Sequence, residues 1–221
     1  MQIAMTEAIS MKLSIEEADA VFGRPMGIPK TGVFALYDLI GIDLMSDVLK
    51  SFKKELDPKD DFQNVVDGIP IIKTLIDSGY TGRKGKGGFY RINKENNKKT
   101  LEALDINENT YSPSKKIELN IEKVNLLELI NRDDKYGKYA WSVISKIILY
   151  SSSLVPQITK EYNDIDEALR LGFNWSMGPF EMLESIGLHN FFSKLGNTKI
   201  NPFLQNRKKK GSKNFYEERQ K

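Results

Sequence analysis

The stretch GFNWSMGPFEMLESIGL, residues 172–188, decides the fold of this chain. A helix with the sequence DIDEALRLG ends at Gly172, and the five residues FNWSM then form a turn. Pro179 follows in the first turn of a second helix, which is acidic and amphipathic, and proline is favoured at such a position. The pattern predicts two helices joined by a tight turn.

The same pattern occurs near the start of the chain as GRPMGIPKTGVFALYDLIGI, residues 23–42. When the two halves are laid over each other, Asp19 falls on Asp166 and a later block matches at five positions. Those positions are Gly32, Phe34, Asp38, Ile40 and Gly41 in the first half, and Gly178, Phe180, Glu184, Ile186 and Gly187 in the second. A third match joins KGKGGFY (residues 84–90) with KKGSKNFY (residues 209–216). Three matches in the same order predict a tandem duplication of one helical unit.

Local signals predict helices through most of the chain. Ser14 and Glu17 form a capping box for a helix that stops at Gly23. Thr31 is expected to cap the next helix, which Gly41 ends. The spacing of apolar residues predicts further helices over residues 44–52, 69–79 and 136–155.

Composition narrows the kinds of site that are possible. The 221 residues include no cysteine and one histidine, His189, which excludes disulfides, thiolate nucleophiles and cysteine metal sites. A zinc site would need mostly carboxylates, and we predict no metal site. The longest apolar run, residues 141–155, is shorter than the roughly 20 residues that span a bilayer. We expect no secretion signal, no membrane association and a cytoplasmic location.

Basic residues gather in two loops, TGRKGKGG (residues 81–88) and NRKKKGSK (residues 206–213), although the net charge is only +3. Such clusters can hold phosphates or nucleic acid. No stacking aromatic residues alternate with these bases, and this favours solvated loops over a nucleic-acid site. Nucleic acid is therefore not an expected partner.

Taken together, the motifs resemble the C-terminal helical domain of the 3-hydroxyacyl-CoA dehydrogenases. The resemblance rests on the Gly-Pro-Phe-Glu run at residues 178–181 with its flanking helices, and on GRKGKGGFY at residues 82–90. The order of the motifs is most similar to large bacterial members and to multifunctional fatty acid oxidation proteins that carry two copies of this domain. The first copy departs from the pattern, with Thr-Gly-Val-Phe-Ala at residues 31–35, and the second lacks the Gly-Phe pair.

The resemblance implies an all-α fold with a duplicated helical domain, of the class found at the C-terminus of 6-phosphogluconate dehydrogenase. Residues 1–115 are expected to hold the first helical unit and a linker, and residues 116–221 the second unit. The polar, turn-rich residues 92–116 are the predicted linker region. At most a small β-hairpin, through residues 101–104, is expected between the copies.

Family members bind NAD through a Gly-x-Gly-x-x-Gly turn in a domain that precedes the helical one. Here the single Gly-x-Gly begins at Gly85, follows a helix and has Tyr90 at the third glycine position, so it fails in spacing and context. The resemblance implies that NAD and the catalytic His-Glu pair belong to a domain this chain lacks. We therefore assign no catalytic, cofactor-binding or metal-binding residue on the chain itself.

The resemblance also implies contacts with an acyl-CoA substrate. Pro179, Phe180 and Leu183 could line the acyl-CoA cleft, although packing in the core is the favoured interpretation. Arg83, Lys84 and Lys86 could touch CoA phosphates, against the alternative of a solvated loop.

Five other residues have simpler explanations. Duplication explains why Asp38 and Glu184 occupy equivalent helix positions. His189 is expected at the surface or at a helix cap, because it has no recognisable carboxylate partner to orient it as a base. Trp141 and Trp175 are expected to be packing residues.

Two hypotheses for function remain open. In the first, the chain is the substrate and dimerisation region of a fatty acid β-oxidation 3-hydroxyacyl-CoA dehydrogenase, inactive on its own. It either works with a separately encoded NAD-binding domain or is left over from a split gene. We then expect a monomer in which the two copies form an internal pseudo-dimer. In the second, it is a non-catalytic scaffold or binding protein with basic loops.

Overall fold

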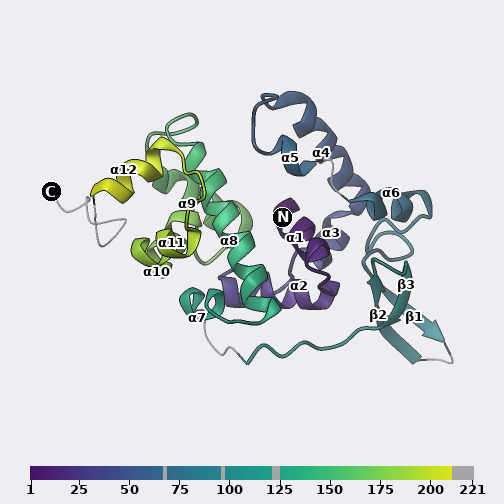
Figure 1. Ribbon diagram of the computed structural model, residues 1–221. Coiled ribbons are helices and arrows are strands. Elements are labelled where there is room, and N and C mark those ends of the chain that lie inside the picture. The colour runs from purple at the N-terminus through teal and green to yellow at the C-terminus, as the bar shows by residue number, and fades with distance from the viewer. Residues whose placement is uncertain (67–68, 96–97, 121–124, 211–221) are drawn as a thin grey trace. The chain divides into compact units, whose positions relative to one another are not determined.

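The computed structural model describes residues 1–66, 69–95, 98–120 and 125–210 (Figure 1). The chain forms two compact units, and neither is a single continuous segment. Unit 1 consists of Met1–Gly23 and Lys30–Asn120, and unit 2 consists of Arg24–Pro29 and Ile121–Lys221. In the described part of the chain, no helix has the length and apolar character needed to cross a membrane.

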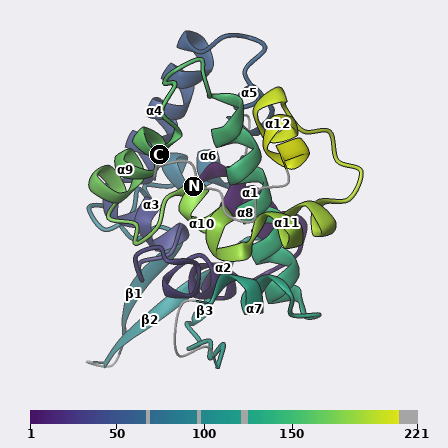
Figure 2. The same ribbon diagram turned by 90° about the vertical axis from the view of Figure 1, so that its left-hand side faces the viewer.

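Unit 1 combines helices with one small antiparallel sheet. Its helices are α1 (Gln2–Ser10), α2 (Ile15–Val21), α3 (Phe34–Ile40), α4 (Ile42–Glu55), α5 (Gln63–Val66) and α6 (Pro70–Asp77). Its strands are β1 (Tyr90–Glu95), β2 (Lys98–Asp105) and β3 (Thr110–Pro113), paired in the order β1-β2-β3. Strands β1 and β2 run side by side (Figures 1 and 2). Helix α2 packs on β2.

The sheet corrects the expectation of a single small hairpin at residues 101–104. Those residues lie within one strand, β2, and the described residues form three strands instead of two. The predicted linker is a folded part of unit 1, because Ala103 and Leu104 are only 3% and 2% exposed. Most other residues of β2 are exposed and polar, so the strand has too few apolar residues to stand out in the sequence.

The predicted capping box is confirmed at the start of α2. The Ser14 hydroxyl accepts from the Glu17 amide at 3.2 Å, and the Glu17 carboxylate accepts from the Ser14 amide at 3.1 Å. The prediction for Thr31 is wrong, because Val33 is the N-cap of α3 and makes no side-chain capping bond. The cap is supplied instead by Asp19, from the preceding helix.

Unit 2 is helical throughout its described part. It contains the short 3-10 helix η1 (Arg24–Met26), α7 (Leu126–Ile130), α8 (Lys135–Ser153), α9 (Tyr162–Phe173), α10 (Pro179–Ile186), α11 (Leu188–Leu195) and α12 (Pro202–Lys210). Helix α10 packs against α7, α8, α9 and α11, and thus forms the centre of the unit. Helix α9 continues one residue past Gly172, and Asn174 closes it in the left-handed conformation.

The segment Arg24–Pro29 is bound to unit 2 by its backbone. The Gly27 carbonyl accepts from both the amide and the hydroxyl of Ser176, at 2.8 and 2.9 Å.

Trp141 packs edge-on against Phe191 with the ring centroids 5.6 Å apart, and this contact agrees with a packing role for the tryptophan.

Candidate functional site

Asp19 is a buried carboxylate that joins two parts of unit 1. One oxygen accepts from the Phe34 amide at 2.7 Å, and the other accepts from the Ala35 amide at 3.0 Å and from the Tyr90 hydroxyl at 3.0 Å. Burial raises the pKa of Asp19 to about 7, and the hydrogen bonds from Phe34, Ala35 and Tyr90 act in the opposite direction. Asp19 therefore caps α3 and binds the start of β1.

Asp38, on α3, is the second buried carboxylate, and it binds the loop before β1. Its two oxygens accept from the amides of Phe89 and Tyr90 at 2.8 and 2.7 Å, and its own carbonyl accepts from the Arg83 amide at 2.8 Å. Burial raises the pKa of Asp38 to about 6, against the effect of the two amides. The side chain of Phe89 is fully buried, with its ring edge-on to Phe34 at 4.9 Å.

The loop before β1, residues 81–88, is called here the glycine loop. Its glycines are required because the loop passes very close to Asp38. A Cβ atom at Gly82 would overlap the Asp38 backbone, and one at Gly88 would overlap its carboxylate. The loop amides are mostly engaged within the chain, including those of Gly85 and Lys86, which donate to Gly82 and Gly79. A phosphate-binding turn would instead point its amides toward a ligand.

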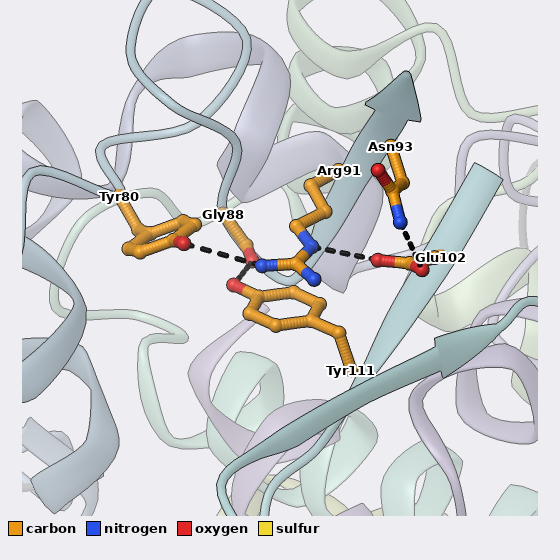
Figure 3. A network of polar contacts seen from close by, with 6 residues as sticks. All are labelled: Tyr80, Gly88, Arg91, Asn93, Glu102 and Tyr111. Carbon is orange, nitrogen blue, oxygen red and sulfur yellow. Dashed lines mark hydrogen bonds and ion pairs between the residues drawn. The ribbon is translucent and has the colours of Figure 1, made fainter. Parts of the chain in front are cut away.

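A network of polar contacts holds the sheet beside this loop (Figure 3). The Arg91 guanidinium donates to Glu102 at 2.7 Å and to the Tyr80 hydroxyl at 3.2 Å, and it lies 4.0 Å from the centre of the Tyr111 ring. Glu102 also accepts from Asn93 at 3.0 Å, and the pKa of Glu102 is lowered by the hydrogen bonds from Asn93 and Arg91. The network fixes β1, β2 and β3 relative to the loop.

A groove of about 940 Å³, called here the basic groove, lies between α2, α3, the glycine loop and the β1–β2 strands. Asp19, Asp38, Glu16 and Tyr90 are part of its wall, and the rest of its lining includes seven basic residues: Lys30, Arg83, Lys86, Arg91, Lys94, Lys99 and Lys115. The oxygens of both carboxylates are occupied by amides or by the Tyr90 hydroxyl. A general base needs a lone pair directed at the substrate, so these carboxylates act as structural anchors.

Unit 2 contains the same cap as unit 1. Asp166, on α9, is 1% exposed and accepts from the Phe180 amide at 2.8 Å, as Asp19 does from Phe34. A Cβ at Gly178 would overlap Asp166, and one at Gly32 would overlap Asp19. The position equivalent to Asp38 is taken by Glu184, which is half-buried, and residues 211–216 of the third sequence match lie outside the described residues.

The three residues predicted to line an acyl-CoA cleft lie together on α10 and are buried within unit 2. Phe180 and Leu183 are fully buried, and the Phe180 ring packs against Tyr162 and Phe203 at 5.6 and 5.8 Å. Pro179 occupies the first turn of the helix, as predicted. Packing therefore accounts for their present environment, and contact with a substrate stays a prediction.

The basic residues of the glycine loop are exposed and differ in their contacts. Lys84 pairs with Asp43 at 2.8 Å, whereas Lys86 donates to the Ser78 carbonyl at 3.2 Å. Arg83 and Lys86, but not Lys84, line the basic groove. His189 is exposed in the first turn of α11, as expected for a surface residue.

The described residues contain no group of three or more histidine, aspartate or glutamate side chains arranged to hold a metal ion. Sequence reasoning missed the capping role of Asp19 and the anchoring role of Asp38, since each contacts residues far away in the chain. The alignment of Asp19 with Asp166 was the available signal. The fold and this site together define a helical module in which buried carboxylates organise the backbone.

Comparison with known proteins identifies the module. Residues 2–92 and 142–214 match the model of the 3-hydroxyacyl-CoA dehydrogenase C-terminal domain. The chain is 36% identical over 183 residues to a Rickettsia prowazekii protein, and 38% identical over 183 residues to one from Rickettsia felis; both are named as fatty acid oxidation complex trifunctional enzymes. It is also 30% identical over 205 residues to a Bacillus subtilis protein named as a 3-hydroxyacyl-CoA dehydrogenase.

These alignments cover 83%, 83% and 87% of this chain but 25% of each relative, so the chain spans about a quarter of their length. No solved structure was found to match it. The chain belongs to the 3-hydroxyacyl-CoA dehydrogenase family, and it corresponds to the C-terminal domain of that family.

Proposed function

We propose that the chain is the substrate and dimerisation region of a 3-hydroxyacyl-CoA dehydrogenase of fatty acid β-oxidation. The two matches to the C-terminal domain of this family are the observation that carries the proposal. The names of the Rickettsia and Bacillus relatives support the same pathway and reaction. The full enzyme would oxidise a 3-hydroxyacyl-CoA to a 3-oxoacyl-CoA, with NAD as the hydride acceptor.

The two matches would reflect a tandem duplication of one helical unit. The shared aspartate cap supports this, since Asp19 and Asp166 each accept from the amide of the matching phenylalanine. The turns after the two capped helices support it as well. Gly41 ends α3 and begins α4 with φ +116° and ψ 122°, and Gly187 ends α10 and begins α11 with φ +84° and ψ 132°.

In this proposal the 221 residues support catalysis without carrying it out. Oxidation of the hydroxyl needs a base on that hydroxyl and a nicotinamide held in place. Asp19 and Asp38 have their oxygens engaged by the backbone and by Tyr90, and His189 is exposed on a short helix. None of the three is held in the way that a base of this kind requires.

The proposed role of Pro179, Phe180 and Leu183 is to support the wall of an acyl-CoA site from behind. These three residues belong to α10, and their burial would fix the position of this helix. The N-terminal turn of the helix carries the family's Gly-Pro-Phe-Glu sequence. Leu183→Ala should then reduce activity in the assembled enzyme through a cavity beneath that wall. An unchanged rate in a variant that still folds would rule out this role.

Activity measured with and without an NAD-binding domain tests the proposal. The chain alone should form no NADH from 3-hydroxybutyryl-CoA, and addition of the NAD-binding domain of a family member as a separate protein should restore NADH formation. The NAD-binding domain alone is the control. Activity of the chain alone that His189→Ala abolishes would contradict the proposal, because it would assign a catalytic base to an exposed residue.

Light scattering tests a further part of the proposal. Tandem copies of a unit that pairs between subunits in single-copy proteins would leave the chain monomeric. The measured mass should equal that of one chain, 25.2 kDa. A dimer at micromolar concentration would reject the internal pseudo-dimer.

A further inference from the structure

The basic groove of unit 1 has an unusual arrangement of charge on its strands. On the face of β1 and β2 that lines the groove, Lys94 stands directly opposite Lys99 in the antiparallel register. Like charges at opposed positions destabilise a sheet. At another opposed pair of the same two strands, Arg91 stands opposite Glu102 and the two form a close ion pair. The Lys94–Lys99 pair is therefore a local cost that ordinary strand pairing does not explain.

The groove contains little negative charge to compensate these lysines. No ion pair is found for Lys94, Lys99 or Lys30 among the residues that the structure describes, and all three line the groove. Three carboxylates line the groove: Asp19 and Asp38 are buried and engaged by amides, and the half-buried Glu16 accepts from the Lys115 amide at 3.1 Å. Seven lysine and arginine residues line the same groove, so positive charge exceeds negative charge there. The uncompensated charge would favour an anion in the groove.

An apolar pair lies near the two lysines. Ile92 and Leu101 stand opposite each other two residues along the same strands, and they are 52% and 48% exposed. Both line the basic groove. Exposed side chains of this size on a strand contribute little to the core, so the groove offers an apolar surface next to its positive charge.

The groove is also held rigid on two sides. Asp38 accepts from three backbone amides of the loop and the start of β1, and Arg91 joins the strands to Tyr80 and Tyr111. A preformed wall reduces the conformational cost that a ligand must overcome on binding. Arg91 is part of the groove lining, but its guanidinium is paired with Glu102, so its role here is to hold the strands in place.

We propose that the basic groove binds a phosphorylated small molecule that also carries an apolar or aromatic part. The phosphates would lie between Lys94, Lys99 and Lys30, and the apolar part would cover Ile92 and Leu101. A nucleotide and an acyl-CoA both have this chemistry. The inference concerns unit 1 alone, and it does not depend on whether the chain serves a dehydrogenase.

Calorimetry on the full chain with three probes tests the proposal. Pyrophosphate presents charge alone, ADP adds a base, and octanoyl-CoA adds a base and an acyl chain. We expect ADP or octanoyl-CoA, or both, to bind about tenfold or more tightly than pyrophosphate, because only they reach the apolar pair. A preference for octanoyl-CoA over ADP would indicate that the acyl chain covers Ile92, and the reverse preference would indicate the base.

Lys94→Glu tests the charge of the groove directly, because it replaces the like-charged Lys94–Lys99 pair with a pair of opposite charges. It should raise the midpoint of thermal unfolding while weakening each probe by about tenfold or more. Lys59→Glu makes the same change of charge at an exposed position outside the groove, and it should alter binding less than about twofold. Ile92→Thr should weaken the organic probes and leave pyrophosphate unchanged.

Three results would overturn the proposal. One is that no probe binds at millimolar concentration. Another is that Lys59→Glu weakens binding as much as Lys94→Glu, because the effect would then come from net charge. The third is that single-stranded RNA binds more tightly than every probe and depends on Lys94, because the groove would then be a nucleic-acid surface.

Discussion

The two units begin their central helices in the same way and differ in the anchor residue one turn later. In unit 1 the amide at the start of α3 is bound by Asp19, and in unit 2 the amide at the second residue of α10 is bound by Asp166. Four residues after the capped phenylalanine, unit 1 has Asp38, which is 3% exposed and binds a loop, whereas unit 2 has the half-buried Glu184. The cap is thus kept in both units, whereas the carboxylate one turn later is an aspartate in unit 1 and a glutamate in unit 2.

The difference reflects two kinds of constraint. The cap involves a glycine with no room for a side chain, so a change there would disturb a buried carboxylate and a helix end together. Asp38 holds amides at a fixed short distance, and a glutamate is one methylene longer. Replacement by glutamate therefore requires a different path for the chain that it binds.

The largest effect is expected from a side chain added at the cap glycines. Gly32→Ala should lower the free energy of unfolding of unit 1 by roughly 4 kcal/mol, from overlap with Asp19 and from its φ of +74°. Gly178→Ala should cost roughly 2 kcal/mol, because its φ is −82° and the overlap with Asp166 acts alone.

Denaturant unfolding of the two glycine variants can be followed with separate probes. Trp141 and Trp175 both lie in unit 2, so their fluorescence reports on unit 2, and far-ultraviolet circular dichroism reports on all helices. Equal losses in the two variants would show that the left-handed conformation of Gly32 adds no cost.

The second largest effect is expected from pH, through the buried carboxylates of unit 1. The pKa of Asp19 is about 7 in the folded chain, against 3.8 as its ordinary value, so the folded state holds more protons between about pH 4 and pH 7. The free energy of unfolding should therefore fall as pH rises, by roughly 3 kcal/mol over this window. Asp38, with a pKa of about 6, acts in the same direction up to about pH 6.

Thermal unfolding from about pH 4 to pH 8 measures this dependence, and Asp19→Asn should reduce its slope. An increase of stability with pH over the same window would contradict the prediction. It would show that the amides of Phe34 and Ala35 stabilise the charged carboxylate by more than burial destabilises it.

A smaller effect should separate the two anchors. Asp38→Ala leaves the amides of Phe89 and Tyr90 without an acceptor and should cost about 2 kcal/mol of stability in unit 1. Glu184→Ala removes a half-buried side chain and should cost less than about 1 kcal/mol in unit 2. Urea unfolding of both variants gives the comparison, and a larger loss for Glu184→Ala would mean that Glu184 is an anchor as well.

The smallest effect is a gain in unit 2. Gly172 lies within α9, and a Cβ there would meet no other atom within 4 Å. Gly172→Ala should therefore raise the free energy of unfolding by about 0.5 to 1 kcal/mol, as alanine favours helix. The midpoint of Trp fluorescence in urea measures the gain. A loss of stability would mean that this glycine has a role the helix alone does not explain.

Features that depend on nearby residues could be predicted from the sequence. The Ser14–Glu17 capping box, the end of α3 at Gly41 and the position of Pro179 in α10 all depend on contacts within one turn. Helix periodicity and the internal match were therefore enough for most of the fold.

Features that depend on distant residues were missed or misread. Asp19 reaches Phe34, Asp38 reaches Phe89, and no local pattern encodes either contact. The strands around Leu101 were misread as a linker, because most of their side chains remain exposed while a few pack on α2. The basic groove was partly visible as a charged loop, but the facing lysines Lys94 and Lys99 required the register of the strands.

The segment Arg24–Pro29 links the two halves of the sequence in a way that limits how they can be separated. It lies in the first sequence copy and belongs to unit 2, where Gly27 binds Ser176. A gene that lost the first half would also lose the segment Arg24–Pro29 of unit 2. A fragment made of residues 121–221 would lack the same segment. Under the proposed duplication, the two copies would therefore have to be inherited and expressed together.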